Sequence, residues 1–90
     1  MLRLSRMNDD GGTARLRIEG HLVEEWVDLV ARECDAVRRA GGRVTLDLAG
    51  VAYADKRGLA MLRALDPRVV SVVNATPLLQ DQLDEPGFQP

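Results

Sequence analysis

A segment in the middle of the chain, residues 44–60, reads VTLDLAGVAYADKRGLA. Its first part, residues 44–48, is short and apolar, which is typical of a strand in a sheet. The segment then reaches Asp55, whose carboxylate is a good N-cap for a helix. Leucines follow at helical spacing until the chain arrives at Pro67, which ends a helix. The segment therefore predicts a strand that leads into a helix.

The residues before this segment predict a hairpin and a first helix. Residues 1–7 and 13–19 alternate apolar and polar side chains, as half-buried strands do. Residues 8–12, NDDGG, tolerate left-handed backbone angles and favour a tight reversal between the two strands. Apolar residues spaced by three and four then predict an amphipathic helix over residues 23–40.

The residues after it predict a strand and a last helix. Residues 69–73, VVSVV, are the most β-branched run of the chain and predict a buried strand. Thr76 and the proline that follows it predict the start of a short helix over residues 78–83. We expect one domain over residues 1–85 and an unstructured tail over residues 86–90.

The order ββαβαβα predicts a single α/β domain with a mixed sheet. Strands separated by helices are typically parallel, whereas the N-terminal hairpin is antiparallel. We therefore expect the hairpin to be followed by parallel strands, with the helices packed on the sheet.

This element order and the central segment resemble the STAS domain family. That family includes bacterial anti-sigma-factor antagonists and regulatory subunits of transport systems. The most specific part of the resemblance is a strand ending in Asp-Leu-x-Gly-Val, here residues 47–51, then the aromatic Tyr53. Asp-x-x-Gly-Leu follows at residues 55–59 and opens a helix. The resemblance covers nearly the whole chain and implies a STAS-like fold and a function in binding other proteins.

In that family, one of the two positions after the second Asp commonly carries a serine or threonine that a partner kinase phosphorylates. Lys56 and Arg57 occupy these positions here. Neither side chain has a hydroxyl group, and their positive charge does not imitate a phosphate. The resemblance therefore implies a STAS-like scaffold with no phosphorylation site at the family position.

Lys56 and Arg57 also fall in the first turn of the predicted helix, where unpaired N–H groups already give a partial positive charge. One hypothesis is that they form an anion site with the Gly58 amide, for an acidic partner side chain or a phosphate. The alternative is that both side chains simply extend into water. Asp55 is a candidate for the same partner surface besides its capping role, and Gly58 predicts a close approach of the helix to its neighbours.

The composition of the chain limits the classes of function that we expect. The chain has 90 residues, of which 46% are hydrophobic and 29% charged, which allows one small globular domain. Twelve basic and fourteen acidic residues give a net charge of -2, which argues against a nucleic-acid partner. One cysteine and one histidine cannot make a disulfide or a structural zinc site, so we expect no metal and no cofactor. Without a long apolar run or a secretory signal, we expect a cytoplasmic protein that does not insert into a membrane.

Few residues are candidates for catalysis. Cys34 belongs to the apolar stripe of the first helix, where a cysteine acts as a small hydrophobe. His21 is expected to be a surface residue, and Asp9 and Asp10 are explained by turn chemistry. Asp47 is expected to accept hydrogen bonds at a strand end or turn. No nucleotide-binding or hydrolase motif occurs, so we predict that the chain is not an enzyme.

Two features favour binding instead. Trp26 lies at the edge of the apolar stripe, where it completes the core or, alternatively, anchors a partner. The first strand of the hairpin is expected at a sheet edge, where edge pairing could give a homodimer, although Arg3 and Arg15 oppose it.

We therefore predict an interaction module similar to anti-sigma-factor antagonists, with an anti-sigma-factor or kinase-like partner. The first alternative is a cytoplasmic STAS-type subunit that regulates a lipid or other ABC transporter through its ATPase. The second is a site for a nucleotide or small anion at the start of the second helix.

Overall fold

The structure is a computed structural model that describes residues 2–8 and 12–84. The predicted order ββαβαβα is confirmed. None of the described helices is long and apolar enough to cross a membrane. The elements are β1 (Leu2–Asn8), β2 (Thr13–Leu22), α1 (Glu25–Arg39), β3 (Arg43–Ala54), α2 (Lys56–Ala64), β4 (Val70–Val73) and α3 (Pro77–Asp84).

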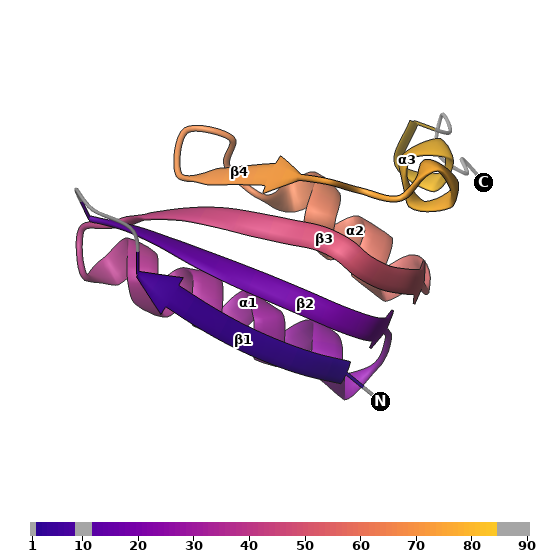
Figure 1. The fold of residues 1–90 in the computed structure, drawn as a ribbon, viewed down its shortest axis with the longest axis horizontal. Coiled ribbons are helices and arrows are strands. Elements are labelled where there is room, and N and C mark those ends of the chain that lie inside the picture. Colours follow the sequence, from indigo (N-terminus) through magenta and orange to yellow (C-terminus); the bar gives the residue numbers. More distant parts are fainter. Residues whose placement is uncertain (1, 9–11, 85–90) are drawn as a thin grey trace.

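One mixed sheet of strand order β1-β2-β3-β4 organises the domain. β1 is antiparallel to β2, and the other two pairs are parallel, as predicted. Figure 1 shows α1 and α2 on the same side of the sheet. α3 lies past the end of β4, beside the part of β3 that β4 does not reach. The fold prediction is therefore confirmed, including the place of β1 at a sheet edge.

The core fills the space between the sheet and α1 and α2. Leu16 and Ile18 of β2 and Leu46 of β3 are fully buried and lie on the sheet face that the helices cover. α1 contributes the buried stripe Val27, Val30, Cys34 and Val37. The helical spacing of the apolar residues had predicted this stripe.

β3 is one continuous strand rather than the short strand over residues 44–48. It continues through Gly50 because the ladder with β2 resumes after two register shifts. A Cβ at Gly50 would lie 2.7 Å from the Cγ of Glu19, so glycine lets the two strands stay close there. The sequence suggested that the strand ends before Gly50, because glycine usually interrupts strands. Here Gly50 allows the strand to continue beside Glu19.

The strand predicted over residues 69–73 is confirmed as β4, but the prediction that it is buried was wrong. β4 is an edge strand, and Ser71 and Val72 are exposed, Val72 to 39%. β-branched residues favour strands but do not determine how many neighbours a strand has.

Two further predictions concern residues that the structure does not describe. Residues 9–11 of the predicted reversal and residues 86–90 of the predicted tail are outside the described residues. The start of α3 is described and agrees with the prediction, since Thr76 Oγ1 accepts a hydrogen bond of 3.2 Å from the Leu79 amide.

Candidate functional site

Asp55 joins the beginnings of two helices. Its Oδ1 accepts a hydrogen bond from the Gly58 amide at 2.7 Å, which confirms the predicted N-cap of α2. Its Oδ2 accepts a second bond from the Glu24 amide at 3.0 Å. Glu24 immediately precedes α1, so one carboxylate fixes the starts of α1 and α2 relative to each other.

Glu24 has an unusual backbone conformation, with φ 48° and ψ -127°. A side chain is disfavoured at these angles, which glycine adopts readily. The turn is closed by the Trp26 amide, which donates to the Val23 carbonyl at 3.0 Å. The bond to Asp55 helps to hold Glu24 in this turn. No pattern in the sequence marked Glu24, because its partner Asp55 is distant along the chain.

Gly58 is buried where α2 meets the end of β2. A Cβ at this position would collide with the Leu22 carbonyl oxygen and lie 3.2 Å from the Leu22 Cγ. The same carbonyl accepts a bond of 3.2 Å from the Asp55 amide. The predicted close approach at Gly58 is thus confirmed, and the neighbour is backbone rather than a side chain that could move away.

Arg57 pairs with α1. Its Nη2 donates to Oδ1 and Oδ2 of Asp28, both at 2.9 Å, and both side chains are more than half exposed. Asp28 therefore bonds to α2 rather than to Arg32, its neighbour at four-residue spacing. The carboxylates of Asp28 and Asp55 place negative charge near the first turn of α2 and offset the positive charge of its two cations. Lys56, the other cation of the turn, is exposed.

The environment of Asp55 keeps its carboxylate ionised. The Gly58 N–H lowers the pKa of Asp55 most, and the Glu24 N–H and the nearby Arg57 lower it further against the opposing effect of burial. An ionised carboxylate with its oxygens bonded to backbone is suited to structure and not to proton transfer.

The aromatic residues near the turn differ in exposure. Trp26 is partly buried and packs against the core, which agrees with its role in completing the core. Tyr53, the aromatic residue of the motif, is 48% exposed. Its ring meets that of the exposed His21 edge to face, with centroids 6.4 Å apart. Tyr53 therefore adds an exposed aromatic surface just before the turn.

Cys34 lies away from the turn. It is 5% exposed, and burial, with a contribution from Glu33, raises the pKa of its thiol to about 11. A thiol with a raised pKa is a poor nucleophile at neutral pH.

Asp47 accepts hydrogen bonds, as predicted. Arg15 Nη2 donates to its Oδ2 at 2.9 Å, and the Ala49 amide and Asn74 Nδ2 donate to its Oδ1 at 3.0 and 3.3 Å. The Ala49 N–H lowers the pKa of this carboxyl most, followed by Arg15 and Asn74, while burial opposes them. The ion pair with Arg15 was not foreseen, because its two residues are far apart along the chain.

Comparison with known proteins identifies the fold. No family model and no curated protein matches the chain. Among solved structures, it is similar to the anti-sigma factor antagonist SpoIIAA in its unphosphorylated form, with a TM-score of 0.69. The match covers 89% of this chain and 80% of SpoIIAA at 14% sequence identity. The chain has a STAS-like fold.

Structures of Mglu also match this STAS-like domain. One has a TM-score of 0.64 over 78% of the chain, and Mglu in its native form has 0.58 over 82%, both at 20% identity. The chain spans only 19% and 22% of the length of these two proteins. At these sequence identities, the matches establish the fold of the chain and not its function.

Proposed function

We propose that this STAS-like domain is a non-catalytic protein-binding module of a bacterial regulatory system, acting in the cytoplasm. Its partner, an anti-sigma-factor or kinase-like protein, contacts the turn at the start of α2. The supporting observation is the construction of this turn. Asp55 bonds to two backbone amides and Gly58 fits against Leu22, so the turn presents Lys56 and Arg57 on a rigid support.

An acidic side chain of the partner is the group that suits this turn. Both bonds from Arg57 to Asp28 use Nη2, and a guanidinium has five N–H donors. Arg57 can therefore bind a second carboxylate and keep Asp28. Lys56 adds a second cation on the exposed side of the turn.

A nucleotide or free phosphate suits the turn less well. The Gly58 amide, which would bind such an anion, already donates to Asp55. A phosphate there would also lie beside the ionised Asp55 carboxylate, which repels it. The transporter alternative concerns the identity of the partner and stays a prediction of the sequence.

Recovery of the partner tests the proposal. The tagged chain is purified from its native host, co-purifying proteins are identified, and their affinity for the pure chain is measured by titration calorimetry. We expect Lys56→Ala and Arg57→Ala to weaken binding by about tenfold each at low salt and by less at high salt. Arg32→Ala is the matched control on α1 and should bind like the wild type.

The outcomes separate the alternatives. Wild-type affinity in both turn variants would contradict the proposal. A transporter ATPase among the co-purifying proteins would favour the transporter alternative. Stabilisation of the chain by nucleotide in thermal-shift measurements would favour the alternative of a nucleotide or small-anion site.

A further inference from the structure

The sheet face turned away from α1 and α2, the outer face, differs in charge from the rest of the molecule. Strand register places four arginines on it, set against the carboxylates of Glu19 and Asp47. The whole chain has a net charge of -2, so the remaining surface is clearly acidic. The four arginines are Arg3, Arg15, Arg17 and Arg43.

These arginines form a diagonal line. Arg3 of β1 lies opposite Glu19, Arg17 and Arg15 follow on β2, and Arg43 of β3 lies opposite Thr13. Residues on one face of a strand are about 7 Å apart, and neighbouring strands are about 5 Å apart. The line therefore crosses three strands over about 20 Å.

Part of this positive charge is not neutralised, since four arginines share the outer face with two carboxylates. Asp47 is only 6% exposed and pairs with Arg15. Within residues 2–8 and 12–84, the ion pairs involve neither Arg3, Arg17 nor Arg43, and all three side chains are exposed. The outer face also exposes Met7 to 50%, beside Arg15 in the register.

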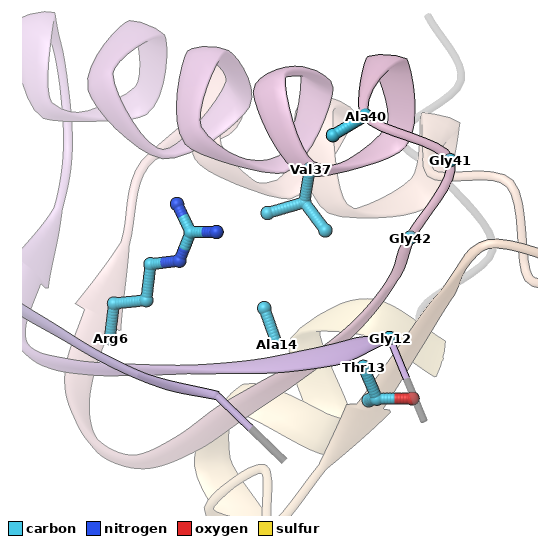
Figure 2. Close-up of a pocket in the computed structure, with 8 residues that line it drawn as sticks. All are labelled: Arg6, Gly12, Thr13, Ala14, Val37, Ala40, Gly41 and Gly42. Atoms are coloured by element: carbon cyan, nitrogen blue, oxygen red, sulfur yellow. The ribbon is translucent and has the colours of Figure 1, made fainter. Parts of the chain in front are cut away.

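Arg6, another arginine of β1, lies on the other face of the sheet. It lies opposite Leu16 on the face that the helices cover. Figure 2 shows its side chain extending toward α1, at a hollow of about 230 Å³ that Val37 and Ala14 also line. Arg6 is exposed but lines this hollow on the α1 side of the sheet, whereas the four arginines of the line lie on the outer face.

We infer that the outer face is a docking surface for an acidic helical segment of a partner protein. Parallel strands are usually covered on both faces, and among the described elements α1 and α2 cover one face of β2, β3 and β4. Carboxylates at four-residue spacing on a helix lie about 6 Å apart, close to the spacing of the arginines. Complementary charge of this kind steers and orients a partner.

This surface is separate from the turn at the start of α2. The turn follows the end of β3, whereas Arg43 begins that strand. The inference rests on the proposed function only in that the chain acts by binding. Failure of one site leaves the other unaffected.

An acidic peptide tests the inference. The probe is an alanine-based helical peptide with glutamate at every fourth position, titrated into the labelled chain at low salt and followed by amide NMR shifts. The same peptide with glutamine is the control probe. We expect shifts at Arg3, Arg17 and Arg43, and none with the glutamine peptide.

Paired variants make the result specific. Arg17→Glu with Arg43→Glu should weaken binding by about tenfold or more, and Arg17→Lys with Arg43→Lys should retain most of it. Arg32→Glu with Arg68→Glu makes the same charge change elsewhere and should stay within about twofold of the wild type. Equal loss in both Glu pairs, absence of binding, shifts confined to another surface, or tighter binding of an oligonucleotide of equal charge would each overturn the inference.

Discussion

Asp47 in the middle of β3 and Asp55 just after its end use the same chemistry in different settings. Asp47 accepts bonds from two side chains, those of Arg15 on β2 and Asn74 after β4, and from the backbone amide of Ala49. Asp55 bonds to the backbone amides of Gly58 and Glu24. Two of the three bonds to Asp47 therefore require particular side chains nearby, whereas both bonds to Asp55 require only the path of the backbone around it.

This difference shows how the domain supports a binding surface. Asp47 connects parts of the sheet, which is the frame of the fold. Asp55 connects the beginnings of α1 and α2, where the proposed partner binds. Because the Asp55 bonds use the amides of Glu24 and Gly58, substitutions of the Lys56 and Arg57 side chains leave these bonds in place.

The largest effect is expected from Gly58→Ala, which places a methyl group against the Leu22 carbonyl. We expect a loss of about 3 kcal/mol in the free energy of unfolding, measured by urea denaturation. Gly41→Ala is the control, since Gly41 has φ 83° but open space around it. It should cost only about 1 kcal/mol. Equal losses would contradict the close fit of α2.

The second-largest effect is expected from Asp47→Ala, with a loss of about 2 to 3 kcal/mol in the free energy of unfolding. The substitution leaves Arg15 and the Ala49 amide without their acceptor. A double-mutant cycle with Arg15→Ala measures the part that belongs to the ion pair. Additive losses in the cycle would show that the ion pair contributes nothing and that Asp47 acts through its bonds to Ala49 and Asn74.

Asp55→Ala should cost less, about 1 to 2 kcal/mol, as is usual for loss of an N-cap. A larger loss in the free energy of unfolding for Asp55→Ala than for Asp47→Ala would show that the carboxylate at the turn stabilises the domain more than the carboxylate in the sheet. The measurement is the same urea denaturation, with circular dichroism to show that both variants are folded.

The pH dependence of stability tests the contributions of the same two carboxylates, Asp47 and Asp55. The pKa values of Asp47 and Asp55 are lowered in the folded state. Their stabilisation is therefore present above the unfolded pKa of about 3.9 and is lost as the pH falls through the lower folded values. Asp47→Asn and Asp55→Asn should each flatten the fall in melting temperature on acidification. An unchanged slope in one variant would show that the carboxylate of that residue does not contribute to the loss of stability in acid.

The smallest effect expected is a gain. Glu24→Gly relieves a backbone conformation that favours glycine, so it should stabilise the chain by about 1 kcal/mol. The bond from the residue 24 amide to Asp55 should persist. Destabilisation instead would mean that the Glu24 side chain contributes contacts that outweigh its strain.

The sequence predicted the interactions that are local. The bond between Asp55 and Gly58 spans one helical turn, so cap chemistry was enough to find it. The spacing of apolar residues likewise predicted α1 and its buried stripe. The alternation of residues in the hairpin predicted β1 and β2.

The interactions that were missed connect distant residues. Glu24 and Asp55, Asp28 and Arg57, and Arg15 and Asp47 meet only because the sheet and helices bring them together. The exposure of β4 depends on its place at the edge of the sheet, which its own residues do not encode. A single sequence shows what each segment favours but not which charged side chains become neighbours.

Hydrogen exchange of the chain in complex with its co-purified partner tests the central claim most directly. We predict new protection of amides at residues 53–58, with the strongest change at Lys56 and Arg57. Protection confined to the outer face would support the acidic docking surface and contradict the turn as the binding site. Unchanged exchange at residues 53–58 in a formed complex would contradict the proposed function.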